Sequence, residues 1–234
     1  MTAKAARTNR VTRAAVLGLV LLAAAPAQAA WDPLEAVNRR VHAANAVVQA
    51  RVLAPAADLY LSTTSPGFRR GVGNVLGTLA EPVTAVSALA AWDLDAAGNA
   101  AARFSINATL GWGGVRDRAA EWGWAPRPVT PGDALCRWGV PAGPYLVLPL
   151  LGPATLRDAA ARAATGAALS GALGGDVVAA WGAADGFHFY AGLYREAARV
   201  EAGSLDPYAV LRSAHAQRRA AACAVDRAAE DADE

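Results

Sequence analysis

Five polar residues stand among small and apolar residues in the helical pattern that runs from residue 71 to residue 123. They are Glu81, Asp93, Arg103, Asn107 and Asp117. Arg103 and Asn107 are four residues apart, so they share one face of a helix. An arginine on an apolar helix must be paired or solvated, and we expect its partner to be Glu81, Asp93 or Asp117. Two roles stay open for this arginine, and they can hold together: a buried ion pair that fixes helix packing, and a contact with the charged headgroup of a lipid.

The sequence contains no pattern that is typical of a catalytic or cofactor site. It has no Gly-x-Ser-x-Gly, no His-Glu-x-x-His, no Cys-x-x-Cys pair and no dinucleotide-binding fingerprint. Its histidines, His42, His188 and His215, lie in unrelated segments, and His188 has no companion at metal-ligand spacing. We therefore expect no enzymatic activity, no cofactor and no metal. A lipid hydrolase assembled from distant residues is the weaker alternative.

The N-terminus has the three parts of a secretory signal peptide. Lys4, Arg7, Arg10 and Arg13 precede an apolar run that ends in Ala27-Gln28-Ala29. The run is shorter than the roughly 20 apolar residues of a membrane helix, which is the alternative interpretation. We expect cleavage near Ala29, which leaves residues 30–225 as one helical domain and residues 226–234 as an acidic, disordered tail.

Charge and hydropathy bound the class of protein. The formal net charge of +2 becomes −2 when the four cations before Ala29 are removed, so bulk charge does not favour nucleic-acid binding. Hydrophobic residues make up 54% of the chain, which suits a membrane-associated protein, although alanine inflates this share and a soluble Ala-rich bundle is the alternative. Beyond the N-terminus we expect no stretch long and apolar enough to span a bilayer as a simple helix.

Two cysteines, Cys136 and Cys223, are present. An exported chain enters an oxidising compartment, where an even number of cysteines permits a disulfide. Two buried thiols that act as small apolar residues are the alternative.

Three segments have the signature of a helix start, in which a capping side chain precedes a proline. They begin at Asp32-Pro33, Ser65-Pro66 and Asp206-Pro207. The first helix should end near Pro55, and residues 58–64 should connect it to the next helix.

Prolines and glycines predict where the remaining elements break. Pro82 should end or kink its helix at Glu81. The Gly111-Trp112-Gly113-Gly114 sequence is too rich in glycine for a helix interior and predicts a turn. Residues 143–153 are apolar and punctuated by prolines, so we expect an extended or broken segment there and not a central strand.

Four tryptophans crowd the region after this glycine turn. They are Trp112, Trp122, Trp124 and Trp138. Tryptophan favours the boundary between lipid and water, because its ring is apolar while its N–H needs a partner. The alternative is that each fills a core.

Four sequence blocks, taken in order, resemble the MlaA (VacJ) family of Gram-negative outer-membrane proteins that take part in phospholipid transport. The blocks are DPLEAVNRR at residues 32–40, GVGNVLGTLAEP with ARFSINATLGWGGVRD within residues 71–117, GPYLVLPLLGPATLRD at residues 143–158, and DPYAVLRSAHAQRR at residues 206–219. Together they cover nearly the whole predicted mature chain. The chain departs from the family around Gly132-Asp133 and at the signal-peptide junction, where many members carry the cysteine that is lipidated and this sequence has none.

The resemblance implies a fold and a function. The fold would be all-α, a single ring-like or wedge-like domain of kinked amphipathic helices without a substantial sheet. The protein would be exported to the periplasmic leaflet of the outer membrane, remove misplaced phospholipids from the outer leaflet through an amphipathic passage, and so maintain lipid asymmetry. Its partners would be phospholipids, a trimeric porin and a periplasmic lipid carrier. The alternative is a porin-associated scaffold of the cell envelope that does not itself move lipid.

The resemblance also implies which residues matter. Polar residues that match family motifs or would line the lipid passage are Asn38, Arg39, Asn74, Glu81, Asp93, Arg103, Asn107, Asp117, Arg157 and Asp158. Residues that would shape the motifs are Asp32, Pro33, Pro82, Gly111, Gly114, Gly143, Pro144, Tyr145, Pro149, Gly152, Asp206, Pro207 and Tyr208.

Overall fold

The computed structural model describes residues 31–230, with side chains up to residue 223, so the expected signal peptide lies outside the described residues. The elements are α2 (Glu35–Val48), the π-helical turn η1 (Gln49–Leu53), α3 (Ala54–Thr63), α4 (Pro66–Ala90), α5 (Leu94–Thr109), α6 (Arg118–Glu121), α7 (Pro131–Arg137), β1 (Tyr145–Leu148), β2 (Gly152–Thr155), α8 (Leu156–Leu173), α9 (Gly175–Ala202) and α10 (Pro207–Glu230). The expectation of an all-α fold without a substantial sheet is confirmed. Helix α10 runs past the domain boundary that we expected at residue 225.

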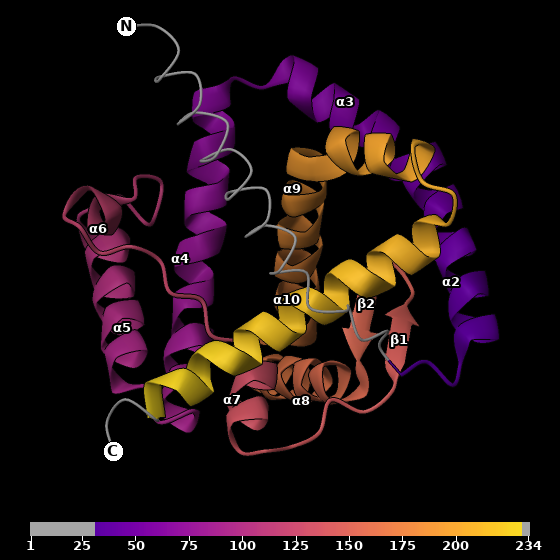
Figure 1. The fold of residues 1–234 in the computed structure, drawn as a ribbon. Coiled ribbons are helices and arrows are strands. Elements are labelled where there is room, and N and C mark those ends of the chain that lie inside the picture. Colours follow the sequence, from indigo (N-terminus) through magenta and orange to yellow (C-terminus); the bar gives the residue numbers. More distant parts are fainter. Residues whose placement is uncertain (1–30, 231–234) are drawn as a thin grey trace, which may run out of the picture.

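The helices are arranged as an open frame (Figure 1). Helices α4, α3 and α2 follow three sides of it, α7 and α8 lie along the fourth, and α10 crosses its face diagonally. The α5–α6 segment lies on the outer side of α4, and the short hairpin of β1 and β2 lies beside α2. This arrangement differs from a closed parallel bundle, in which every helix turns one side to a shared core.

Two of the three predicted helix starts are confirmed. The Ser65 hydroxyl accepts a hydrogen bond from the Phe68 N–H with Pro66 in the first turn, and the Asp206 carboxylate accepts one from the Ala209 N–H at 3.1 Å. The third is wrong, because α2 begins at Glu35, and Leu34 before it caps nothing with its side chain. The Asp32 carboxylate is used by side chains from elsewhere in the fold.

One predicted break is wrong, and another is corrected in part. Residues 58–64 were expected to be a connector, but α3 covers most of them, and Pro55 lies in the first turn of α3, where a missing N–H costs little. Of the end or kink expected at Pro82, the end is absent, because α4 continues from Pro66 to Ala90 with this proline inside it, and the kink stays a prediction. A proline within a helix removes one backbone hydrogen bond, and we attribute the continuity to the packing of α4 along α5 on both sides of that point.

Helix α4 also corrects the expectation that no segment after the N-terminus could span a bilayer. Its mean hydropathy reaches 1.2 over an 18-residue window, and only 28% of that window is buried inside the protein. By length and composition, α4 is therefore capable of crossing a membrane. The core helices of soluble proteins can have the same length and composition.

The proline-punctuated segment after α7 is extended, as its sequence predicts. It folds back on itself as an antiparallel hairpin in which Tyr145 lies opposite Thr155 and Leu148 opposite Gly152. Leu150 and Gly152 have the left-handed backbone conformation that the tight turn requires, with φ of 63° and 76°.

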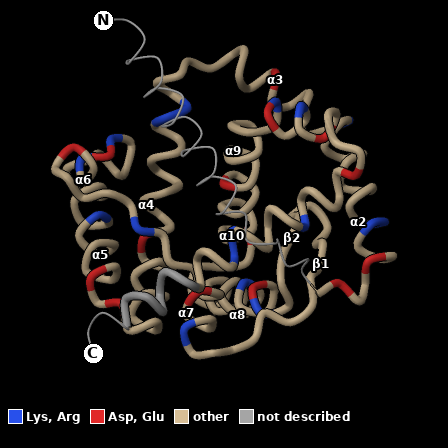
Figure 2. Tube along the Cα trace, viewed as in Figure 1, with Lys and Arg blue, Asp and Glu red and all other residues tan. Residues whose placement is uncertain are grey.

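The buried interior is built of small side chains. One apolar cluster consists of Ala88, Ala96 and Ala97 with Val129 against them, and a second consists of Tyr145, Val147 and Tyr208 with Val41. Most of the large apolar side chains are exposed instead. Charged residues are sparse along α4, which carries only Arg69, Arg70 and Glu81 among its 25 residues (Figure 2).

Candidate functional site

Arg103 is the centre of a buried polar group that joins α4, α5 and α6. Its Nε donates to the Glu81 carboxylate at 2.5 Å, one terminal nitrogen donates to the Asp117 carboxylate at 3.1 Å, and the other donates to the Trp124 carbonyl at 2.6 Å. The Arg103 and Glu81 side chains are only 6% and 8% exposed. The expected ion pair is therefore present, and Arg103 uses two of the three acids that the sequence offered.

Asn107 extends this group by one turn of α5. Its amide nitrogen donates to Asp117 at 2.9 Å, and its amide oxygen accepts from the Ala119 N–H at 3.0 Å. Burial alone would raise the pKa of Asp117, but hydrogen bonds from Asn107, the Ala120 N–H and Arg103 outweigh burial and lower it. Asp117 is therefore held as a carboxylate that anchors the start of α6.

The glycine turn after α5 brings this group together. A Cβ on Gly111 would lie 2.3 Å from the Arg116 carbonyl oxygen, and one on Gly114 would lie 2.7 Å from the Thr78 hydroxyl. Neither position accepts a larger residue without moving the backbone or α4. Asn74 adds a hydrogen bond from α4 to the Val115 carbonyl at 3.0 Å.

Asp93, the third expected partner, does not bind Arg103. Its carboxylate accepts from the Ala96 N–H at 2.8 Å and so caps α5, and its other oxygen lies 3.9 Å from a terminal nitrogen of Arg137.

A second polar group joins α2 to the hairpin through two asparagines seven residues apart. The Asn38 amide donates to the Tyr145 carbonyl at 3.0 Å and accepts from the Val147 N–H at 2.9 Å. The Asn45 amide likewise donates to the Leu148 carbonyl and accepts from the Leu150 N–H. The two side chains thus stand in for a neighbouring strand along β1. Asn45 was not among the predicted site residues, although its seven-residue spacing from Asn38 places both side chains on one face of α2.

Asp32 connects this second group to α10. It accepts hydrogen bonds from the Asn38 amide and the Tyr208 hydroxyl, and Arg212 lies 3.1 Å away. Burial raises the pKa of Tyr208, and the hydrogen bond to the Asp32 carboxylate raises it further, so the hydroxyl stays protonated as the donor.

Arg39 adds contacts between α2 and the start of α10, on the exposed side of this second polar group. Its guanidinium binds both oxygens of Asp206, at 3.1 and 2.8 Å, and lies over the Tyr208 ring. Hydrogen bonds from Arg39 and the Ala209 N–H lower the pKa of Asp206 to about 2.

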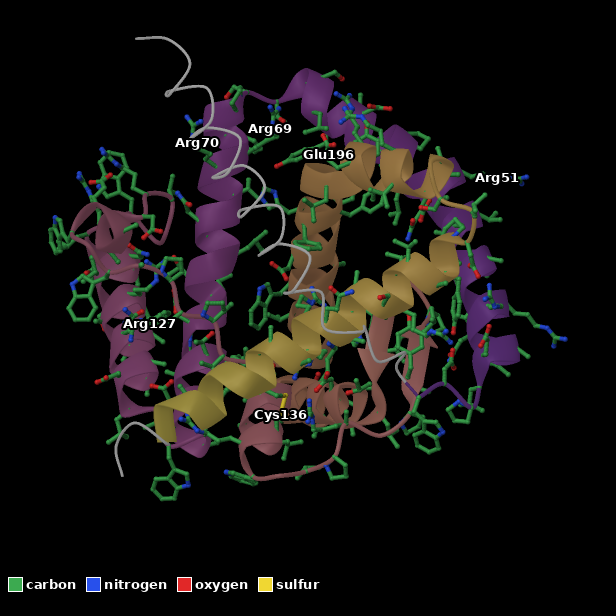
Figure 3. All side chains as sticks on the ribbon, viewed as in Figure 1. Arg51, Arg69, Arg70, Arg127, Cys136 and Glu196 are labelled. Atoms are coloured by element: carbon green, nitrogen blue, oxygen red, sulfur yellow. A yellow bond between two sulfur atoms is a disulfide. The ribbon has the colours of Figure 1, made fainter. Side chains whose placement is uncertain are left out.

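A third polar group joins α7, α8 and α10. Arg157 donates to the Val140 carbonyl at 3.0 Å and contacts Asp158, while Arg219 of α10 binds Asp133 at 2.6 Å and Asp158 at 2.8 Å. Next to this group a disulfide joins Cys136 of α7 to Cys223 of α10, with the Cα atoms 6.0 Å apart (Figure 3). The structure thus contains the bond that the sequence only permitted.

The remaining motif residues shape the backbone. Pro33 lies in the turn before α2, and Pro207 is the first residue of α10. Gly143, with φ of 69°, precedes β1, the Pro144 carbonyl accepts from the Leu156 N–H, and the Pro149 carbonyl accepts from the Leu151 N–H in the hairpin turn.

The three groups lie at different sides of the frame, since α5 and α6 are opposite α2 in Figure 1. Within each group the polar side chains bond mainly to one another and to backbone groups. The described residues include no group of three His, Cys, Asp or Glu side chains that could hold a metal ion. The observed contacts hold the helices together. The role of these residues along a lipid passage stays a prediction.

The outer surface, in contrast to these polar groups, carries large apolar side chains. All four clustered tryptophans, Trp112, Trp122, Trp124 and Trp138, are exposed, so they do not fill a core. Trp92, at the turn between α4 and α5, is 80% exposed, and Trp112, at the far end of α5, is 78% exposed. Exposed apolar surface on this scale typically marks contact with a membrane, a ligand or another protein.

Comparisons with known proteins agree with this architecture. The MlaA lipoprotein family matches residues 30–222. A solved structure described as the structural basis for maintenance of bacterial outer membrane lipid asymmetry is 29% identical, with a TM-score of 0.74, and the match covers 82% of this chain and 98% of that one.

Two relatives show how far the sequence similarity extends. The intermembrane phospholipid transport system lipoprotein MlaA of Escherichia coli strain K12 is 33% identical over 131 residues, which are 54% of this chain and 52% of that protein. An uncharacterized protein of Rickettsia bellii is 37% identical over 128 residues, which are 55% of this chain and 50% of that protein. The chain thus spans about half the length of the curated relatives it matches. Because the family match covers almost all of the described residues, this chain belongs to the MlaA lipoprotein family.

Proposed function

We infer that this protein is the outer-membrane component of an intermembrane phospholipid transport system. It would take phospholipids that are misplaced in the outer leaflet, guide them through an amphipathic passage and release them to a soluble carrier in the periplasm. The name of the Escherichia coli relative and the subject of the similar solved structure support this proposal.

The observation that carries the proposal is the inverted polarity of α4 and α5. The charged side chains at their interface, Glu81 and Arg103, are buried against each other, and the exposed charges Arg70 and Asp95 lie near the starts of the two helices. Many of their large apolar side chains are exposed instead, among them Leu79, Val86, Leu89, Leu94 and Phe104. Water would disfavour this distribution, whereas hydrocarbon favours it, because acyl chains accept apolar side chains and offer no partner to a charge.

The polar groups would serve the transport role by holding the frame open. A phospholipid headgroup crosses hydrocarbon at high cost, and a passage with hydrogen-bonding walls lowers that cost. We propose that the α4–α5 region around Arg103 and Asn107 borders this passage. The paired state of both residues supports a fixed wall, because side chains that are already bonded do not have to be reorganised as a headgroup passes.

The same proposal includes location and partners. The protein would lie in the periplasmic leaflet of the outer membrane, next to a trimeric porin. It carries out no chemical step in this scheme, since phospholipid enters and leaves with its covalent bonds unchanged.

The experiment is a transfer assay with the purified mature protein in vesicles that contain a fluorescent phospholipid. A soluble periplasmic carrier is added, and the fluorescence that moves to the carrier is measured. We expect transfer well above that of protein-free vesicles. Stable binding to a trimeric porin without such transfer would instead support the alternative, an envelope scaffold that does not move lipid.

A further inference from the structure

An apolar groove of about 530 Å³ lies where α4, α7 and α8 meet. Its walls include Val83 and Val86 of α4, Leu135 of α7, and Ala164 and Ala168 of α8. The volume falls within the range of about 300 to 1,000 Å³ that is typical of small-molecule sites. None of the residues assigned to the lipid passage lines it.

The chemistry of the walls limits what the groove can hold. Among the side chains that the structure describes, those of residues 31–223, no charged one lines it. The Ser87 hydroxyl donates to the Val83 carbonyl at 2.7 Å, and the Trp138 indole N–H donates to the Ala90 carbonyl at 2.8 Å, so these two donors are used within the walls. Thr165 adds one further hydroxyl to the lining. A ligand with buried polar atoms would lose its hydrogen bonds to water here and gain few in return.

The groove is continuous with the exposed apolar surface. Val86 is 68% exposed and yet lines it, and Trp138 at its other wall is also exposed. Leu89 and Trp92 follow Val86 along the chain and are exposed in turn. A hydrocarbon chain could therefore enter from the surrounding surface without crossing a polar rim.

We propose that this groove holds one acyl chain of a phospholipid while the headgroup stays outside it. The proposal rests on the proposed function and adds a binding site for the tail of the transported lipid. An acyl chain brings no hydrogen-bonding groups, whereas an extended protein segment would bring unpaired N–H and C=O groups. A partner helix fits less well, because one turn of a cylinder about 10 Å wide would fill most of the volume.

The test uses the full mature protein in vesicles that contain a phospholipid with a photoactivatable diazirine in one acyl chain. After irradiation, the labelled peptides are mapped by mass spectrometry. We expect label on the groove walls of α7 and α8, at Leu135 and Leu169 among others.

Two pairs of variants make the result specific. Ala168→Phe fills the groove. Ala167→Phe adds the same ring to the preceding residue of α8, which does not line the groove. Val86→Asp places a carboxylate at the exposed mouth, and Val177→Asp is the matched change at an exposed valine of α9 that does not line the groove. We expect Ala168→Phe and Val86→Asp to lower labelling of the groove about tenfold, which corresponds to 1.4 kcal/mol of binding free energy. Their controls should label like the unmodified protein.

Three outcomes would overturn the proposal. One is label spread over the exposed apolar surface and insensitive to Ala168→Phe and Val86→Asp. Another is labelling that is unchanged in these variants while binding to a purified porin is lost, which would assign the groove to a protein partner. The third is lipid transfer without any label in the groove, which would leave the proposed function standing. Groove labelling that responds to the variants without transfer to the carrier would instead support the groove and contradict the proposed function.

Discussion

Arg103 and Glu81 form an ion pair across the α4–α5 interface at 2.5 Å, although both side chains are almost fully buried. Removing two charges from water is costly, and the cost is recovered only when each charge is bonded on all sides. Arg103 meets this condition through Glu81, Asp117 and the Trp124 carbonyl. The pair thus lets α4 and α5 carry charge inside while their outer sides stay apolar.

The first prediction concerns this pair. Arg103→Met leaves the Glu81 carboxylate buried without its cation, and we expect the free energy of unfolding to fall by about 3 to 5 kcal/mol. Arg103→Met with Glu81→Leu should recover part of this loss, because the buried Glu81 carboxylate is removed and Asp117 keeps its hydrogen bonds from Asn107 and the Ala120 N–H. Urea unfolding measures both. Arg116→Gln, which breaks an exposed pair with Glu121, is the control and should cost less than about 1 kcal/mol. Equal effects of Arg103→Met and Arg116→Gln would contradict the importance of the buried pair.

The second prediction concerns the asparagine that holds β1. Asn38→Leu removes the partners of the Tyr145 carbonyl and the Val147 N–H, both buried, so we expect a loss of about 2 to 5 kcal/mol. Hydrogen exchange of the Val147 amide should accelerate. Asn38→Asp keeps the acceptor for that amide and should leave its exchange slower than Asn38→Leu does. Unchanged exchange at Val147 in Asn38→Leu would show that the side chain does not serve as a substitute strand.

The third prediction concerns pH. His215 is buried against Tyr145, and no described residue hydrogen-bonds its Nδ1. Burial is the largest cause that lowers the pKa of His215, the charges of Arg218, Arg219 and Arg162 also lower it, and Asp158 acts in the opposite direction. Together they bring the pKa of His215 to about 4.

The unfolded chain therefore binds a proton at His215 near pH 6.5, before the folded protein does. Stability from this residue is fully present above pH 6.5 and is lost as the pH falls toward 4, by about 3 kcal/mol in total. Urea unfolding between pH 7 and pH 4 should show this loss in the unmodified protein and a smaller one in His215→Leu. His188→Leu is the control. The same pH dependence in His215→Leu and the unmodified protein would contradict the assignment.

The fourth prediction concerns the disulfide. The bond between Cys136 and Cys223 closes a loop with a sequence separation of 87 residues and ties α7 to α10. We expect replacement of both cysteines by serine to lower the free energy of unfolding by about 2 to 5 kcal/mol. Dithiothreitol should lower the melting temperature of the unmodified protein and leave that of the double variant unchanged. A melting temperature that is insensitive to the reductant in both proteins would show that the bond is absent in solution.

Local chemistry was predictable from the sequence where only neighbouring residues decide it. The helix starts at Ser65 and Asp206 needed only a capping oxygen and a proline, and the turn at Gly111–Gly114 needed only backbone freedom. Asp32 has the same local signature as these caps, yet α10, more than 170 residues away, takes its carboxylate. The pattern alone could not show that competition.

The candidate site was likewise predictable only in part from the sequence. Helical spacing placed Arg103 and Asn107 on one face, but the choice of Glu81 and Asp117 over Asp93 depends on how α6 folds back. The role of Asn45 could not be predicted from neighbouring residues, because its partners lie more than 100 residues further along the chain. The continuation of α4 through Pro82 likewise depends on tertiary packing, since propensity alone predicts a break.

The most direct measurement of the central claim, that the outer side of α4 and α5 contacts acyl chains, is tryptophan quenching by phospholipids with brominated acyl chains. Variants that keep only Trp92 or only Trp112 are placed in such vesicles, with acrylamide as the water-soluble quencher. The account predicts strong quenching by the brominated chains and weak quenching by acrylamide at both positions. Strong quenching by acrylamide with none from the brominated lipid would show that this surface faces water, and would contradict the account.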